Sequence, residues 1–334
     1  MDITEVTATL KTLGACTVWH PDLEHAKRLV MKSIATTAER KDPSSVLLTG
    51  KSGVGKTRLC KIIERDIGRA YQVDCEKYVK LIRPCVYVEV PSNANIKSMA
   101  IGILMELLNT IEEIETPPTE EIEKIRQKEL EKMSMAKTKT MIIRRLHTLE
   151  TQLLILDEFH HVADRGQEIT KKAICSWLTE LLNKSEIPIL ISGLDKIIAI
   201  INSIPELSGR YSYRAVIEEL AYCNAAEAPI FLSVLAGLQR EMIRLGNLEK
   251  YVHLTDPKLY KAVFLATGGN FRVLSDLLND SFRIALERDD KTLVIADFIE
   301  ACNDLYFSQL HGNPFNMSVK ELDSRLAARL NQKK

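Results

Sequence analysis

The sequence predicts an α/β fold with a parallel five-stranded sheet flanked by helices, followed by a small all-helical domain. Short, continuously apolar segments alternate with helical patterns as far as about residue 223. Strands that are apolar throughout are typical of a parallel sheet covered on both faces. Beyond residue 223 only helical periodicity remains. The 334 residues are also enough for about two domains of ordinary size.

The elements follow one another in a regular order. Residues 1–40 are predicted as a short extended lead and a helix that His20-Pro21-Asp22 opens. The α/β domain is expected over 41–223, with strands at 45–49, 85–90, 153–158, 187–192 and 215–220. The Glu- and Lys-rich stretch 120–139 is predicted as a solvated helix that connects two core elements. The second domain, 224–310, is expected to hold helices at 229–245, 257–268, 271–288 and 294–307, before a short basic tail at 311–334.

The composition, 46% apolar and 27% charged, is that of a soluble globular protein. No apolar run is long enough for a membrane span, and the acidic N-terminus argues against a secretory signal. Seven cysteines without a C-x-x-C pair argue against a disulfide framework or zinc ribbon and for a reducing cytosol. We therefore expect a cytoplasmic protein. Since 45 basic and 45 acidic residues cancel, any nucleic-acid contact must come from a local basic patch.

Residues 50–57 match the phosphate-binding pattern G-x-x-x-x-G-K-T between a predicted strand and a predicted helix. The glycines let backbone N–H groups surround phosphates at the start of the helix. Lys56 is expected to reach the β and γ phosphates of ATP, and the Thr57 hydroxyl to bind Mg²⁺. The predicted nucleotide-binding residues are Gly50, Lys51, Ser52, Gly53, Val54, Gly55, Lys56, Thr57 and Arg58.

Two carboxylates, Asp157 and Glu158, end a strand that is otherwise apolar. Asp157 is predicted to hold Mg²⁺, through water or in the second coordination sphere, and Glu158 to activate the attacking water as general base. A glutamate in that place indicates hydrolysis of ATP to ADP and phosphate. Glu158, His160 and His161 could also form a metal site, but the carboxylates already have roles, so we expect one histidine to line the site and the other to pack.

Three further residues complete the predicted catalytic set. Ser192 ends the fourth apolar strand, where a polar side chain can orient the attacking water. Arg210 lies between the fourth and fifth strands, and Arg272 begins a helix of the second domain. A single arginine is usually a solvated surface group, but these residues fall at the places that one architecture requires. Arg210 is best used on the nucleotide of a neighbouring subunit, with Arg214 as the fallback.

In the order of these motifs the chain resembles the AAA+ ATPases over roughly residues 20–310, most of all the branch of origin-recognition and DNA-loading proteins. Trp19-His20-Pro21, the residues Leu47–Gly50 and the segment Asp157–His161 look like the TniB/TnsC transposition regulators. The compact length is similar to the TnsC proteins of CRISPR-associated transposons. The resemblance implies a P-loop AAA+ domain with a helical lid. Ser192 departs from the asparagine of many AAA+ proteins, although a hydroxyl can still polarise water.

The resemblance also implies a function. Members of the family assemble on duplex DNA in the ATP-bound state, as rings or helical filaments, and hydrolysis controls the assembly. They connect a target-selecting complex, through a TniQ-type adaptor, with the transposase, in the bacterial cytosol. The main alternative is a helicase loader or replication-initiator ATPase. A C-terminal helix-turn-helix would favour the initiator, and the sequence shows no convincing one. A small-molecule kinase is disfavoured by Glu158, a GTPase by the lack of N-K-x-D, and a signalling scaffold by the lack of a repeat domain.

DNA contacts are expected, by the same resemblance, in the segments after the second strand and before Asp157. The polar and basic residues there are Asn93, Asn95, Lys97, Lys137, Lys139, Arg144 and Arg145. Lys97 ranks first because it falls in the first turn of a helix, where backbone N–H groups also face anions, and Lys139 ranks second. Such contacts would be to phosphates, and therefore sequence-tolerant and sensitive to salt.

Overall fold

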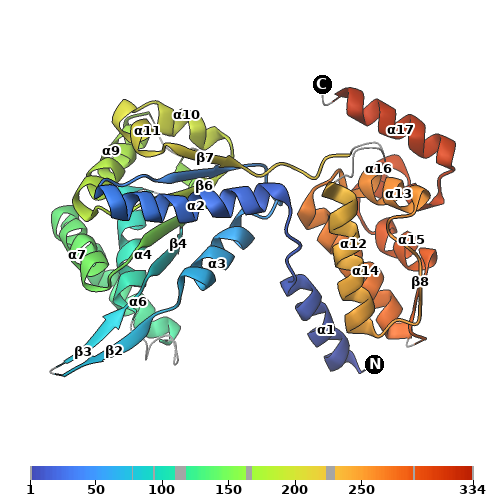
Figure 1. Ribbon diagram of the computed structural model, residues 1–334, viewed down its shortest axis with the longest axis horizontal. Helices are drawn as coiled ribbons and strands as arrows, with labels where there is room; N and C mark the ends of the chain where they lie inside the picture. Colours follow the sequence, from blue (N-terminus) through green and yellow to red (C-terminus); the bar gives the residue numbers. More distant parts are fainter. Residues whose placement is uncertain are drawn as a thin grey trace. The chain divides into compact units, whose positions relative to one another are not determined.

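The computed structural model describes residues 2–76, 78–92, 95–109, 118–162, 168–222, 230–288 and 290–332. The chain divides into two compact units (Figure 1): residues 22–217 form an α/β unit, and residues 1–21 join 218–334 in a largely helical unit. The region 1–40, predicted as one extension, is therefore shared between the units. The tail 311–334 also belongs to the helical unit.

The α/β unit is built on a five-stranded parallel sheet in the order β4-β5-β6-β1-β7. Its strands are β1 (Val46–Thr49), β4 (Cys85–Glu89), β5 (Leu153–Asp157), β6 (Ile189–Gly193) and β7 (Tyr213–Val216). The predicted sheet is thus confirmed. The fifth strand begins at Tyr213 rather than at residue 215, because Tyr213–Val216 is the stretch that pairs with β1.

Helices cover both faces of this sheet (Figure 1). On one face lie α2 (Pro21–Arg40) and α3 (Lys56–Ile67), whose apolar side chains pack with Val46 and Leu48. On the other lie α4 (Ile96–Leu108), α7 (Met135–Thr148) and α9 (Glu168–Ser185), which pack with Leu154 and Leu156. Alternate residues of a strand point to opposite faces, so a continuously apolar strand supplies both cores.

The charged stretch 120–139 forms two helices instead of one. The first, α6 (Glu120–Glu131), buries only Leu130 among its residues, as a solvated helix should. The second, α7, starts at Met135 after the N-cap Ser134, whose hydroxyl accepts from the Lys137 N–H. Two short helices, α10 (Lys196–Asn202) and α11 (Pro205–Arg210), then connect β6 to β7.

Among the elements that were not predicted are an antiparallel strand pair and an N-terminal helix. The strands β2 (Tyr71–Cys75) and β3 (Tyr78–Ile82) pair antiparallel. Their side chains are mostly exposed and so leave no clear apolar alternation in the sequence. The predicted extended lead is wrong, because α1 (Ile3–Ala15) is helical. Its helix is stabilised by packing of Val6 and Leu13 in the core of the helical unit rather than by strong helix propensity.

The helical unit contains α12 (Ile230–Gly246), α13 (Pro257–Thr267), α14 (Phe271–Arg288), α15 (Ile295–Asn303), α16 (Tyr306–His311), a 3₁₀ turn (Pro314–Asn316) and α17 (Val319–Gln332). The helix predicted at 294–307 is thus two shorter helices. A small parallel bridge, β8 (Lys250–Tyr251) with β9 (Thr292–Leu293), means that the unit is not purely helical. The start of α13 is as expected, with Asp256 as N-cap and Pro257 in the first turn.

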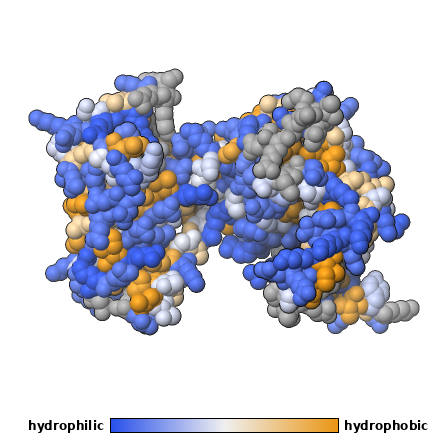
Figure 2. Space-filling view, turned by 180° about the vertical axis from the view of Figure 1, so that it is seen from behind, coloured by the Kyte–Doolittle hydropathy of each residue, from blue (hydrophilic) through white to orange (hydrophobic). Residues whose placement is uncertain are grey.

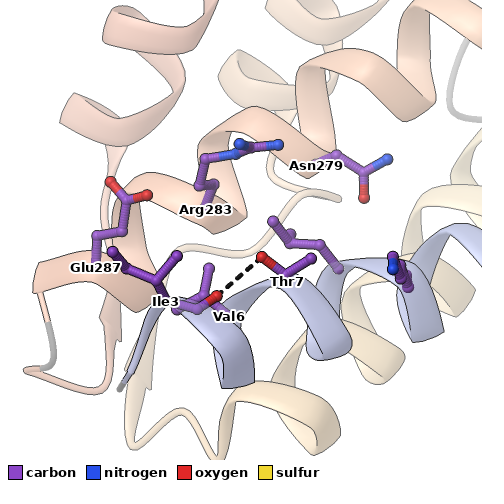
Figure 3. Close-up of a pocket in the computed structure, with 8 residues that line it drawn as sticks. Ile3, Val6, Thr7, Asn279, Arg283 and Glu287 are labelled. Carbon is purple, nitrogen blue, oxygen red and sulfur yellow. Dashed lines mark hydrogen bonds between the residues drawn. The ribbon is translucent and has the colours of Figure 1, made fainter.

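A pocket of about 480 Å³ lies between α1 and α14 in the helical unit (Figure 3). Ile3, Val6 and Thr7 line it from α1, and the polar side chains of Asn279, Arg283 and Glu287 line it from α14. The Thr7 hydroxyl donates to the Ile3 carbonyl within α1 and so does not face a partner across the pocket. None of the motif residues lines this pocket.

The surface agrees with the sequence composition. On the face drawn in Figure 2, hydrophilic residues cover most of the surface, and apolar residues form separate patches. Among the described residues no helix is both long enough and apolar enough to cross a membrane.

Candidate nucleotide-binding and hydrolysis site

The loop between β1 and α3 has the backbone that a phosphate-binding loop requires. Gly50, Gly53 and Gly55 have φ values of 149°, 78° and 105°, a region that side chains disfavour. A Cβ at Gly50 would lie 2.2 Å from the Ile217 carbonyl oxygen, so only glycine fits between β1 and the end of β7. Helix α3 then begins at Lys56 with exposed Thr57 and Arg58 in its first turn. The N-terminus of such a helix is a site for anions.

Lys56 is buried beneath this loop. Its ammonium group donates to the carbonyl oxygens of Gly50, at 2.8 Å, and Lys51, at 2.7 Å. Burial lowers the pKa of Lys56, and the negative charges of Glu158, Asp157 and Asp195 oppose that shift. The structure therefore brings the predicted lysine close enough to both predicted carboxylates for their charges to interact, although the carboxylates lie about a hundred residues away in sequence.

Asp157, at the end of β5, is fully buried and held on both oxygens. The Tyr87 hydroxyl, from β4, donates to Oδ2 at 3.0 Å, and the Glu158 N–H donates to Oδ1 at 2.9 Å. Burial and the neighbouring carboxylate raise the pKa of Tyr87, which keeps its hydroxyl protonated and able to donate. The chemistry of the group suits Mg²⁺: Asp157 supplies carboxylate oxygen and Thr57 a hydroxyl, both hard ligands. Sequence reasoning missed Tyr87, because a tyrosine inside an apolar strand resembles an ordinary core residue.

Glu158 follows Asp157 with φ of 56°, a left-handed conformation that is uncommon for a residue other than glycine. Its Oε2 lies 3.1 Å from Nδ1 of His160. The His160 and His161 rings lie 4.5 Å apart, and Glu158, His160 and His161 each offer one ligand atom within 4.8 Å of the others. The histidines are thus neighbours of the carboxylate predicted to act as base.

The end of β6 lies against this turn. The Ser192 carbonyl accepts from the Phe159 N–H at 2.9 Å, and a Cβ at Gly193 would lie 3.1 Å from the His160 nitrogen. The Ser192 side chain is fully buried on the side of α3. Burial and the charge of Asp157 raise the pKa of the Cys60 thiol on that helix. Contact of the Ser192 hydroxyl with an attacking water stays a prediction.

Asp195 is a further residue that the sequence did not single out. It precedes α10, three residues after Ser192, and its charge acts on Lys56. A polar residue in the loop after a parallel strand was the available signal, since such loops meet at the ligand-binding edge of the sheet.

Arg210 lies at the opposite edge of the sheet. Its carbonyl accepts from the Ser45 N–H at 2.8 Å, just before β1 begins, and its guanidinium pairs with Asp42. The P-loop follows the other end of β1. Four residues of strand separate the two positions by about 13 Å along the sheet, and the Arg210 side chain points away from the P-loop toward Asp42. Arg214 is also on this edge, where it donates to Asn202 and Ser208.

Comparison with known protein families matches residues 19–219 to the family described as bacterial TniB protein. The chain belongs to the TniB family. The match covers the α/β unit with its P-loop, both carboxylates and Arg210. No curated protein matches the chain significantly in sequence.

Solved structures with the same fold are AAA+ proteins. The chain is similar to the Aeropyrum pernix ORC1 protein in complex with DNA (TM-score 0.57, 18% identity, 88% of this chain and 67% of that chain). It is also similar to Cdc6p from Pyrobaculum aerophilum (TM-score 0.55, 14% identity, 88% and 71%) and to a Walker-type ATPase of Pyrococcus abyssi (TM-score 0.53, 13% identity, 91% and 76%). The predicted P-loop AAA+ fold is confirmed, and this TniB-family chain is an ATPase.

Arg272 of this TniB-family protein belongs to the helical unit. It is exposed in the first turn of α14, and its N–H donates to the Asn270 side chain at 3.1 Å. The preceding Gly268 and Gly269 have φ of 65° and 78° and form the tight connection from α13 to α14. Since Arg272 and the P-loop lie in different units, its contact with nucleotide stays a prediction.

The predicted DNA contacts differ in their surroundings. Lys97 is exposed in the first turn of α4, after Asn95 and Ser98 cap that helix reciprocally. Lys139 is only 19% exposed and pairs with Glu180, whose pKa is lowered to about 2 by Lys139 and Lys184. The structure therefore does not favour Lys139 as a DNA contact. Asn93 lies outside the described residues.

The remaining candidates lie along α7. Lys137 is exposed in its first turn, whereas Arg144 is exposed and Arg145 half-buried nearer its end. The carbonyl of Leu149, just after α7, accepts from the Arg83 N–H at 2.7 Å, where β4 is about to begin. Arg83 also pairs with Glu106 near the end of α4. Both helices thus begin at the end of the sheet where the P-loop and Asp157 follow their strands, which we call the nucleotide edge. Lys97 and Lys137 lie at this edge, and Arg144 lies toward the opposite one.

Proposed function

We propose that this chain is an ATP-dependent regulator of DNA transposition that assembles on duplex DNA. By its family resemblance, it would connect a target-selecting complex, through a TniQ-type adaptor, with the transposase, in the bacterial cytosol. ATP with Mg²⁺ would favour the assembled form, and hydrolysis would end it. The TniB family match, on a chain with a complete set of ATPase motifs, is the observation that carries this proposal.

The placement of Arg210 supports assembly. The nucleotide edge carries Lys56, Asp157 and Glu158, but the predicted arginine finger lies beyond the other end of β1. Such an arginine can serve a nucleotide only if a second copy brings it there. A site completed between subunits makes hydrolysis depend on assembly, and so turns the ATPase into a switch.

Duplex DNA is the partner that the exposed basic residues at the nucleotide edge would recognise. Lys97 and Lys137 lie in the first turns of neighbouring helices, α4 and α7, where the positive end of the helix dipole also favours phosphate. The chain as a whole is neutral, so a few such contacts, repeated by each subunit, would have to provide the affinity. Arg144 remains a weaker candidate because it lies away from this edge.

The test is duplex binding by the wild type and by the Lys97→Ala, Lys137→Ala variant, with a slowly hydrolysed ATP analogue. We expect ATP-dependent binding by the wild type, with electron microscopy showing rings or filaments. The double variant should bind ATP normally but lose about 10-fold or more in duplex affinity, with a smaller salt slope, because about two phosphate contacts are lost per subunit. Lys128→Ala, an exposed lysine of α6, is the matched control and should bind DNA as the wild type does.

Two outcomes would contradict parts of the proposal. A double variant with wild-type affinity and salt slope would place the DNA contact elsewhere. If the wild-type protein binds no DNA in any nucleotide state, it is not a DNA-assembled regulator of transposition. That result would favour a helicase loader that acts on another protein.

A further inference from the structure

We propose that His160 is a positioning residue for Glu158: its Nδ1–H holds the carboxylate in the orientation that activates water and keeps it from collapsing onto Lys56. The proposal rests on the proposed role of Glu158 as general base. The observation behind it is the 3.1 Å distance between His160 Nδ1 and Glu158 Oε2. The two atoms are within hydrogen-bond distance but are not aligned as a hydrogen bond in this structure. Catalytic hydrogen bonds often align only when substrate binds.

His160 is the fixed member of this pair. Its side chain is 13% exposed, against 33% for Glu158. On one side of it in sequence, Phe159 is fully buried and its N–H donates to the Ser192 carbonyl. The end of β6 packs against its backbone so closely that a Cβ at Gly193 would lie 3.1 Å from the His160 nitrogen. A residue whose backbone is held between the ends of two strands in this way can restrain a more exposed glutamate.

Glu158 needs such a restraint because of what it faces. Among the neighbouring charges, that of Glu158 has the largest effect on the pKa of buried Lys56, ahead of Asp157 and Asp195. An unrestrained carboxylate would be attracted to the ammonium group, where it would occupy the place of the γ phosphate and lose its basicity. A hydrogen bond from His160 offsets that attraction while leaving the second carboxylate oxygen, Oε1, available for water.

If His160 acts as a hydrogen-bond donor to Glu158, a substitution that keeps a donor at the place of Nδ1 should preserve activity. An asparagine amide nitrogen occupies nearly the place of histidine Nδ1, whereas a glutamine amide nitrogen is closer to the place of Nε2. His160→Asn can therefore donate to Glu158 where His160→Ala cannot, and His160→Gln should fall between them. His161→Ala is the matched control, since it removes the adjacent ring, 4.5 Å away, without removing the Nδ1 donor.

The experiment measures steady-state hydrolysis by the full chain with Mg²⁺ and duplex DNA. For His160→Ala we expect kcat to fall about 10-fold with KM for ATP within about 2-fold of wild type, because the base is misplaced but the P-loop is intact. His160→Asn should recover most of the lost kcat, and His161→Ala should retain the wild-type value. In the background of Glu158→Gln, the further change His160→Ala should cost almost nothing, because its effect acts through the carboxylate.

Three results distinguish a failure of the His160 role from a failure of the proposed Glu158 role. If Glu158→Gln hydrolyses ATP at the wild-type rate, Glu158 is not the base and the proposed role of that residue fails. If Glu158→Gln is inactive but His160→Ala turns over normally, only the positioning role of His160 is wrong. A His160→Ala loss that Asn does not recover, or that persists undiminished in the Glu158→Gln background, would also overturn it by indicating general damage to the turn.

Discussion

The two edges of the sheet carry different parts of the same chemistry. At the edge where β1, β5 and β6 end lie the P-loop lysine, the two carboxylates and Asp195. At the edge where β1 begins lie Arg210, its partner Asp42 and Arg214. The first edge carries the residues predicted to bind nucleotide and activate water, whereas the second carries the arginine predicted to stabilise charge in the transition state. If these predicted roles are right, one copy of the chain holds both halves of the site but cannot combine them.

Lys56→Ala should have the largest effect, because it removes the charge at the centre of the nucleotide edge. Nucleotide affinity should fall by about 100-fold, since roughly 3 kcal/mol of charged hydrogen bonding to phosphate is lost. Hydrolysis should be undetectable. Calorimetric titration with ATP checks the affinity, and an unchanged dissociation constant would refute the P-loop assignment.

Arg210→Ala tests the opposite edge. ATP should still bind, but kcat should fall by about 1,000-fold, as is typical for loss of an arginine finger, and assembly should weaken. Mixing this variant with Lys56→Ala protein should restore some hydrolysis, because an intact P-loop of the first can meet an intact Arg210 of the second. Absence of rescue at every mixing ratio would mean that Arg210 does not act in trans.

Glu158→Gln separates binding from hydrolysis at the nucleotide edge. The amide keeps the size of the side chain but not its basicity, so kcat should fall by about 100-fold while ATP affinity is retained. The assembled form should persist because ATP hydrolysis no longer ends it. Size-exclusion chromatography after ATP addition measures this persistence. Disassembly at the wild-type rate would show that hydrolysis does not limit it.

Tyr87→Phe should give the smallest effect. The buried Asp157 carboxylate would lose one of its two donors, which should lower the free energy of unfolding by about 1.5 kcal/mol and slow hydrolysis by only a few fold. Chemical denaturation measures the first effect. Tyr78→Phe, on exposed β3, is the control and should change stability little. Equal effects of the two substitutions would mean that the Tyr87 hydroxyl does not support the nucleotide edge.

Local patterns in the sequence were sufficient for the regular parts of the fold. Continuously apolar segments identified the five strands, and the Asp256-Pro257 start and Gly268 end delimited α13. The P-loop was also readable, because its glycines and Lys56 are consecutive and their chemistry is local. The strand pair β2–β3 and the helix at 3–15 escaped prediction because the first exposes most of its side chains and the second depends on contacts far away in sequence.

The sequence by itself determined that this chain binds phosphate next to a parallel sheet and ends a buried strand with two carboxylates. Only the tertiary structure decided how residues far apart in the chain are used. It joined Tyr87 to Asp157, set His160 beside Glu158 against the end of β6, tied Lys139 to Glu180, and placed Arg210 beyond the far end of β1. The physical reason is that sheet order and register set these distances, and strands that are neighbours in the sheet are separated by many residues in the sequence.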